Sequence, residues 1–216
     1  MSMWRRMATA LGVIGATVAL HEMAHALVAV WLGGRVREVS VGFGPALLRA
    51  KVRSVPVTVR AVPAGGFAAI DVDHLPPARR IPMLLAGPLA NLAVGLALSV
   101  GLRRHPVVPF GTGRKVGLSG MLGTMSALMH AAEQGPGAVG RLAGAVNVGL
   151  GVMNLLPVYP LDGGHVALNL LEARGVSVRA RAAFAGLTAA AFLWLAQAAV
   201  VADLRQVFGQ RGTPRP

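Results

Sequence analysis

The segment VALHEMAHALVAVWLGG, residues 18–34, places three ionisable side chains inside an apolar run. His21, Glu22 and His25 fit the pattern H-E-x-x-H. On a helix, residues four positions apart share one face about 6 Å apart along the axis, so both imidazoles can reach one metal ion. Glu22 is rotated about 100° from His21, which suits a general base toward metal-activated water better than a third ligand. The segment therefore predicts half of a catalytic metal site.

A catalytic zinc takes three protein ligands, so two histidines leave one protein ligand to be found. Asp162 lies in NLLPVYPLDGGH, residues 154–165, where Pro157 and Pro160 interrupt an apolar run. Broken helices at membrane depth are tolerated where the backbone lines a cavity. Taken alone, Asp162 also suits the N-cap of a following helix or an Asp-Gly turn. The unfilled ligand position favours Asp162 as the partner of the two histidines.

The composition indicates a membrane protein. Apolar residues make up 54% of the 216 residues and charged residues only 13%, with a mean hydropathy of +0.60. The net charge of +13 comes from cations that lie mostly between apolar runs, which favours lipid headgroups and topology over nucleic acid. The absence of cysteine excludes thiolate ligands, so a metal site must use His, Asp or Glu.

Four apolar runs are long enough to cross a bilayer, which takes about 20 residues. The first run resembles a signal peptide at its start, but the apolar pattern continues through the metal motif and predicts a retained helix. Pro88 in the second run and Pro157 after the third predict a kink and an interrupted helix end. We expect a mostly α-helical, polytopic membrane protein, with one domain over residues 1–216. The expected spans are residues 7–32, 81–102, 138–156 and 180–201.

Two further elements are expected between the spans. Residues 35–70 are rich in β-branched residues, glycine and proline, and their period-two alternation predicts a small membrane-associated β-structure. Residues 116–132 carry apolar side chains at helical spacing, which predicts an interfacial amphipathic helix before the third span. The same spacing also suits a helix packed on the protein's own core.

Several motifs together resemble one known family. HEMAH, residues 21–25, and NLLPVYPLDGG, residues 154–164, lie on different spans, and the second fits the pattern N-x-x-P-x-x-x-L-D-G. PAGGF, AGPLAN and GLSGMLG reinforce the match in the same order. The chain resembles the site-2 protease family of intramembrane zinc metallopeptidases over nearly its whole length. Many of those relatives carry a PDZ domain after the second span or C-terminal CBS domains, and we expect a minimal form without either.

The resemblance implies one Zn²⁺ per chain. His21, His25 and Asp162 would bind it, and Glu22 would act as general base and later as proton donor. The active site is then expected towards the cytosolic side of the cell membrane.

The resemblance also implies substrate contacts. Gly65 and Gly66 resemble the membrane-associated β-loop that helps to receive substrate, and Asn154 and Asn147 resemble asparagines that hold substrate backbone. Hydrogen bonding between helices is the alternative for both asparagines. Asn91 of AGPLAN is interpreted as structural.

The expected function is therefore intramembrane zinc endopeptidase activity in regulated intramembrane proteolysis. The substrate would be a single-span membrane protein, such as an anti-sigma factor or a signal-peptide remnant. Two alternatives are a divalent-metal transporter and a non-catalytic membrane scaffold of the same family. A transporter predicts several ligand clusters along a path, whereas the sequence suggests one.

Overall fold

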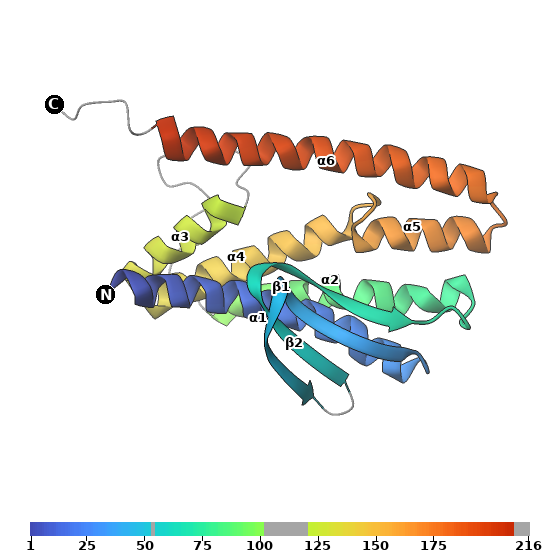
Figure 1. Ribbon diagram of the computed structural model, residues 1–216, viewed down its shortest axis with the longest axis horizontal. Helices are drawn as coiled ribbons and strands as arrows, with labels where there is room; N and C mark the ends of the chain where they lie inside the picture. The colour runs from blue at the N-terminus through green and yellow to red at the C-terminus, as the bar shows by residue number, and fades with distance from the viewer. Residues whose placement is uncertain (53–54, 102–120, 210–216) are drawn as a thin grey trace.

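A computed structural model describes residues 1–52, 55–101 and 121–209, and within them the chain is mostly helical with one small sheet (Figure 1). The order of elements matches the expected fold class. The elements are α1 (Met3–Trp31), β1 (Arg35–Val52), β2 (Val55–Asp71), α2 (Pro77–Gly101), α3 (Met121–Gln134), α4 (Pro136–Leu155), α5 (Asp162–Ala173) and α6 (Val178–Gly209).

Four of these helices are long and apolar enough to cross a membrane: α1, α2, α4 and the Val178–Val201 part of α6. The expectation of four spans is thereby confirmed. The helix α2 continues through Pro88 without a break, whereas α4 ends at Leu155, just before Pro157. A proline lacks the N–H that would continue the hydrogen bonds of a helix, so Pro157 accounts for the end of α4, as the sequence predicts.

The helix α2 packs on α1, α4 and α5 and forms the centre of the helical body. Small residues let α2 and α4 approach closely. A Cβ added to Gly95 would lie 2.9 Å from the Gly144 carbonyl oxygen, and one added to Gly151 would lie 2.8 Å from the Pro88 carbonyl oxygen. Close packing of this kind is a main source of helix association in membranes, because lipid tails are as apolar as the side chains.

The predicted β-structure is present as an antiparallel pair, β1 and β2, that projects from one side of the helices (Figure 1). The middle of β1 has β2 on both sides, since Val39 pairs with Ala68 and also with Val57. Val39 and Val55 are buried against Ala26 of α1, which seats the sheet on that helix. The sheet therefore lies beside the helix that carries the H-E-x-x-H motif.

An arginine ties the sheet together. Arg60 donates hydrogen bonds to Ser40 Oγ (2.8 Å), to a Glu38 carboxylate oxygen (2.8 Å) and to the Gly44 carbonyl (3.1 Å). Hydrogen bonds from Thr58 and Arg60 hold the pKa of Glu38 below its usual range. These contacts fix the bent part of β1.

The helix α3 covers the last part of the predicted amphipathic helix, whose residues 116–120 lie outside the described part of the chain. It packs on α1 and α4, and Leu128 is fully buried. An ion pair between Arg6 and Glu133 joins it to α1. The face of α3 that carries Leu128 is therefore packed on the protein's own core, which was the alternative to an interfacial helix.

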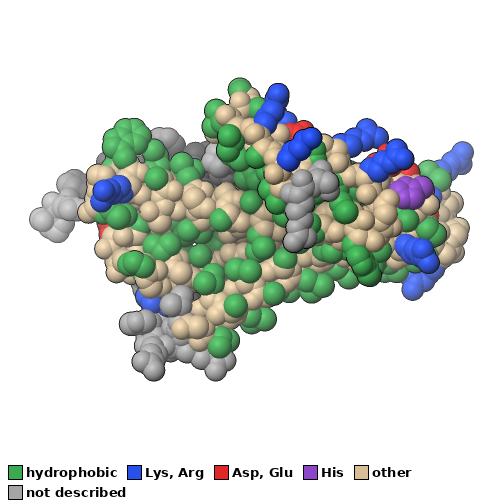
Figure 2. All heavy atoms as spheres, turned by 90° about the horizontal axis from the view of Figure 1, so that it is seen from below, with side chains coloured by type: hydrophobic (Ala, Val, Ile, Leu, Met, Phe, Trp, Pro, Cys, Tyr) green, Lys and Arg blue, Asp and Glu red, His purple; other side chains and the backbone are tan. Residues whose placement is uncertain are grey.

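The helix α6 lies apart from the main body and contacts chiefly α5 (Figure 1). None of its most apolar 18-residue window is buried within the protein. Figure 2 shows hydrophobic side chains along the length of the molecule, with Lys and Arg gathered mainly toward one end. A surface of this kind suits a lipid environment.

Candidate metal centre

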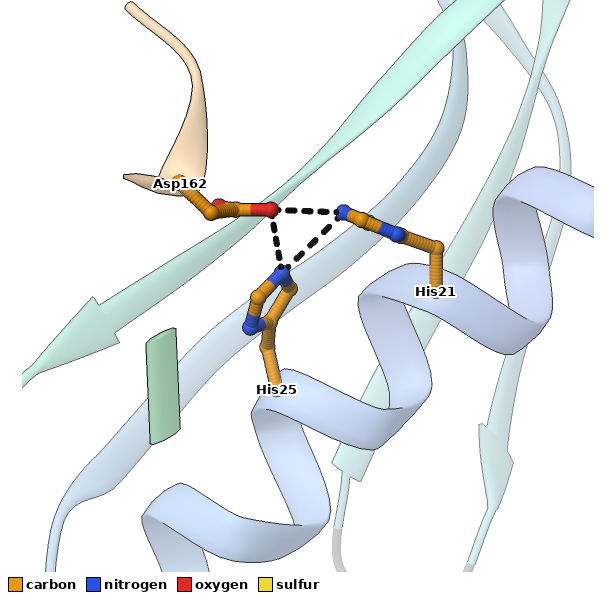
Figure 3. A group of neighbouring side chains, drawn as sticks. All are labelled: His21, His25 and Asp162. Atoms are coloured by element: carbon orange, nitrogen blue, oxygen red, sulfur yellow. Dashed lines mark hydrogen bonds and ion pairs between the residues drawn. The ribbon is translucent and has the colours of Figure 1, made fainter. Parts of the chain in front are cut away.

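The three expected ligands lie together, although they come from α1 and from the first turn of α5 (Figure 3). His21 Nε2 is 3.0 Å from Asp162 Oδ2 and 3.1 Å from His25 Nε2. His25 Nε2 is 3.3 Å from the same carboxylate oxygen. Both imidazoles are buried, and the Asp162 side chain is 18% exposed. Three ligand atoms therefore point at one small volume.

The spacing of these atoms fits zinc. Ligand atoms held about 2.0–2.1 Å from a tetrahedral zinc lie about 3.3 Å from one another. The three observed separations, 3.0, 3.1 and 3.3 Å, are close to that edge length. Two imidazoles and one carboxylate also match the donor set of catalytic zinc sites, which leave the fourth position to water or substrate. The residues present therefore fit a catalytic zinc ion.

The far side of each imidazole is also engaged. His25 Nδ1 is 2.7 Å from the Met83 carbonyl oxygen, which can only accept, so His25 carries its proton on Nδ1. His21 Nδ1 is 2.6 Å from Asn91 Oδ1. Metal-bound histidines generally donate their second ring N–H in this way, which directs the lone pair of Nε2 at the metal. Both rings are arranged as ligands.

Local packing places Asp162. After α4 ends, the chain turns back so tightly that a Cβ on Gly163 would lie 2.4 Å from the carbonyl oxygens of Leu155 and Leu156. A Cβ on Gly164 would lie 2.5 Å from the Tyr159 nitrogen. The two glycines of the LDGG motif are thus required by close backbone approach. The N-cap of α5 is Leu161, so Asp162 is not the cap that one alternative expected, and its carboxylate benefits from the positive end of α5.

Glu22 lies between the ligands and the sheet. Its carboxylate accepts a hydrogen bond from the main chain of Ala68 in β2. A Cβ on Gly66 would lie 3.2 Å from Glu22 Cγ, 2.6 Å from Val18 Cγ1 and 2.5 Å from the Ser40 carbonyl oxygen. Only a glycine lets β2 pass this close to α1. The structure therefore brings the predicted Gly66 beside the predicted general base.

The two predicted substrate-binding asparagines differ. Asn147 is buried and bonded to Asn91, Thr17 and the Ala143 carbonyl, as the interhelical alternative expects. Asn154 is half-buried and donates to the Leu150 carbonyl of its own helix, and its side-chain oxygen accepts no hydrogen bond from the residues that the structure describes. Gly65 has φ of +121°, a backbone conformation that favours glycine.

Sequence reasoning missed three contributors. Gly87 lies against the ligands, because a Cβ there would be 2.3 Å from His25 Nε2. Asn91 contacts His21 directly, although it was interpreted as structural. The His165 ring centroid lies 5.1 Å from that of Tyr159, with the two rings tilted by 57°, and burial lowers the pKa of the His165 imidazole. The AGPLAN motif, which includes Gly87 and Asn91, was the available signal for the first two.

Comparison with known families gives the same answer as the geometry. A family model described as peptidase family M50 matches residues 9–196, which is most of the chain. The chain belongs to peptidase family M50. This is the site-2 protease family, so the resemblance seen in the motifs is confirmed.

Individual M50 relatives share less of the chain. A putative zinc metalloprotease of Chlamydia trachomatis is 37% identical over 106 residues, covering 38% of this chain and 17% of the relative. Zinc metalloprotease Rip1 of Mycolicibacterium smegmatis is 35% identical over 106 residues, covering 40% and 26%. Rip1 of Mycobacterium bovis is 39% identical over 98 residues, covering 38% and 24%. The matched segments thus span about a quarter or less of these relatives.

Proposed function

We propose that this M50 chain is an intramembrane zinc endopeptidase that cleaves membrane segments of other proteins. The observation that carries the proposal is the convergence of His21, His25 and Asp162, whose ligand atoms all lie within 4.8 Å of one another. The histidines lie on a candidate membrane span, and zinc is named in the M50 relatives. Buried ionisable residues in a span are expensive, so a bound metal accounts for their presence.

The chemistry divides between the metal and Glu22. Zinc, when bound, supplies a Lewis acid that polarises a carbonyl and makes water more acidic. Glu22 takes the proton from the attacking water and delivers it to the leaving amine, which requires a carboxylate beside the ligands. Its hydrogen bond to the main chain of Ala68 supports this role, because the contact fixes the carboxylate between α1 and β2.

The sheet supplies a place for substrate. The 66–71 part of β2 pairs with β1 along one edge. Within the described residues, no strand pairs with its other edge. An extended segment can add to such an edge through main-chain hydrogen bonds. Gly65, Gly66 and Asn154 are then substrate contacts, and a helical substrate must unwind to reach Glu22. Suitable substrates are single-span proteins such as an anti-sigma factor or a signal-peptide remnant.

We further propose that the end with the sheet-to-α2 turn faces the cytosol. Residues 33–80, which run from the end of α1 into the start of α2, contain eight Lys and Arg, and this favours the cytosolic side under the positive-inside rule. The chain has no cysteine, so single cysteines at Asp73 and at Ser2 can be labelled with an impermeant maleimide in spheroplasts without background. Labelling of the Asp73→Cys chain in intact spheroplasts would contradict the orientation.

The function is tested with purified full-length protein in liposomes that also contain a labelled single-span protein. We expect cleavage inside the span, loss of cleavage when a chelator removes zinc, and recovery when zinc returns. A parallel assay with a zinc indicator inside protein-containing liposomes tests the transporter alternative. Zinc flux without cleavage would favour a transporter, and neither activity across a panel of single-span proteins would favour a scaffold.

A further inference from the structure

A buried chain of polar side chains runs away from the metal centre through three helices. Asn91 of α2 contacts His21 of α1, Asn147 of α4 contacts Asn91, and Thr17 of α1 contacts Asn147. All four side chains are buried, with Asn91 at 0% exposure. Polar groups at such depth are costly unless they are fully bonded, so the chain of contacts calls for a function.

Main-chain oxygens fix the direction of every hydrogen bond among these buried polar side chains. The Ala143 carbonyl can only accept, so the Asn147 atom 2.9 Å from it is the amide nitrogen. The Asn147 oxygen therefore accepts from Asn91 Nδ2 at 2.8 Å. Asn91 Nδ2 is also 3.4 Å from the Thr17 carbonyl, which again can only accept. Asn91 must consequently turn its oxygen toward His21.

The orientation of Asn91 decides the tautomer of His21. An amide oxygen cannot donate, so the 2.6 Å contact requires a proton on His21 Nδ1. The lone pair of the neutral ring then lies on Nε2, which faces Asp162 and His25. We infer that Asn91, held by Asn147 and Thr17, is a positioning residue that keeps His21 in its metal-binding tautomer. The inference rests on the zinc site of the proposed function, and it goes beyond it by assigning Asn147 to the metal rather than to substrate.

Removing Asn91 is expected to lower metal affinity more than removing Asn147. Removal of Asn91 leaves His21 Nδ1 without an acceptor in a buried site, and loss of such outer partners typically lowers metal affinity by about 10–100-fold. Removal of Asn147 leaves Asn91 with the Thr17 carbonyl as acceptor, so a smaller loss is expected. One face of α1 carries Thr17, His21 and His25, because successive members of this set are four residues apart. The hydrogen-bonded relay formed by Asn91, Asn147 and Thr17 is therefore attached to the same helix face as both histidine ligands.

The test compares purified full-length wild type, Asn91→Leu and Asn147→Leu in micelles, with Asn169→Leu as the matched control. Asn169 is a helix asparagine of α5 whose amide donates to His165 O within its own helix. Thermal unfolding establishes that each variant is folded. Zinc affinity is measured by competition with a chelating indicator, and ring ¹⁵N shifts of the zinc-free protein report which nitrogen of His21 carries the proton.

We expect Asn91→Leu to weaken zinc binding by about 10–100-fold and to remove the proton from Nδ1 in part of the population. Asn147→Leu should weaken binding less, and Asn169→Leu should bind as the wild type does. Wild-type affinity or an unchanged tautomer in folded Asn91→Leu would overturn the inference. An equal loss in Asn169→Leu would overturn it too, because the effect would then be general packing.

A second variant covers the case in which Asn91→Leu does not fold. Asn91→Asp keeps an oxygen opposite His21 Nδ1, and its carboxyl, protonated in this buried position, can still donate to the Asn147 oxygen, so the variant should retain the Nδ1 proton and bind zinc about as tightly as the wild type. A tenfold loss of affinity in folded Asn91→Asp would count against the inference. None of these measurements needs a substrate, so they remain decisive even if the chain fails to cleave any protein.

Discussion

The first and last spanning helices have similar composition but different surroundings. Mean hydropathy is 1.6 for α1 and 1.8 for the Val178–Val201 part of α6. Yet 28% of the most apolar window of α1 is buried within the protein, against none for α6. The buried positions of α1 include Thr17, His21 and His25, whereas α6 exposes large apolar side chains such as Leu187 and Trp194. Hydropathy therefore identifies a span, and its polar residues identify the span that carries the site.

The largest expected effect comes from removing Asp162, the third ligand beside the two histidines of α1. Asp162→Ala leaves two histidines for the metal, so zinc per chain should fall from one to background, and cleavage should be lost with it. Metal analysis of the purified protein measures this. Asp71→Asn is the matched control, because Asp71 is a carboxylate that pairs with Arg37 away from the site. Full zinc content in Asp162→Ala would refute the ligand assignment.

Adding one methyl group should have different effects beside α1 and in α6. Gly87→Ala would place a Cβ 2.3 Å from His25 Nε2, so the imidazole must move and zinc affinity should fall by about tenfold or more, on the scale of lost outer contacts. Gly186→Ala in α6 meets nothing within 4 Å. Alanine is favoured over glycine in a helix by about 0.5–1 kcal/mol, so that variant should be neutral or slightly more stable. Equal zinc affinities of the two variants would remove the distinction.

The sheet side of α1 can be probed apart from the metal side. Gly66→Ala would push β2 away from Val18 and Glu22, while the three ligands keep their positions. Cleavage should fall by about tenfold or more, because misplacing a reacting group by about 1 Å can cost roughly 100-fold in rate. Zinc content should stay at one per chain. Loss of zinc together with cleavage would show that β2 supports the metal centre instead of the substrate.

The smallest effects are expected in α6. Leu187 and Trp194 are 74% and 69% exposed, so alanine at either position removes little packing within the protein. Stability should change by no more than about 0.5 kcal/mol, and zinc content should be unchanged. Thermal unfolding in micelles and metal analysis measure both. A selective loss of cleavage in Trp194→Ala would instead make α6 a substrate contact and narrow the contrast with α1.

Much of this structure follows from local patterns in the sequence. The four spans depend on length and composition, and the ligand set depends on spacing within one helix and on a proline-broken helix end. The relay from Asn91 to Asn147 does not appear in any local pattern, because it joins residues of three helices. The same holds for Gly87, whose importance arises from its distance to His25. The packing of α3 on α1 also depends on tertiary contacts that periodicity leaves open.

The most direct test separates metal binding from chemistry at Glu22. Zinc per chain and cleavage of a single-span protein are measured on the same purified samples of wild type and Glu22→Gln. Glutamine keeps the shape of glutamate but is not a base, and the three ligands remain. We predict one zinc per chain in both proteins and cleavage only by the wild type. Cleavage by zinc-loaded Glu22→Gln at the wild-type rate would contradict the proposed mechanism.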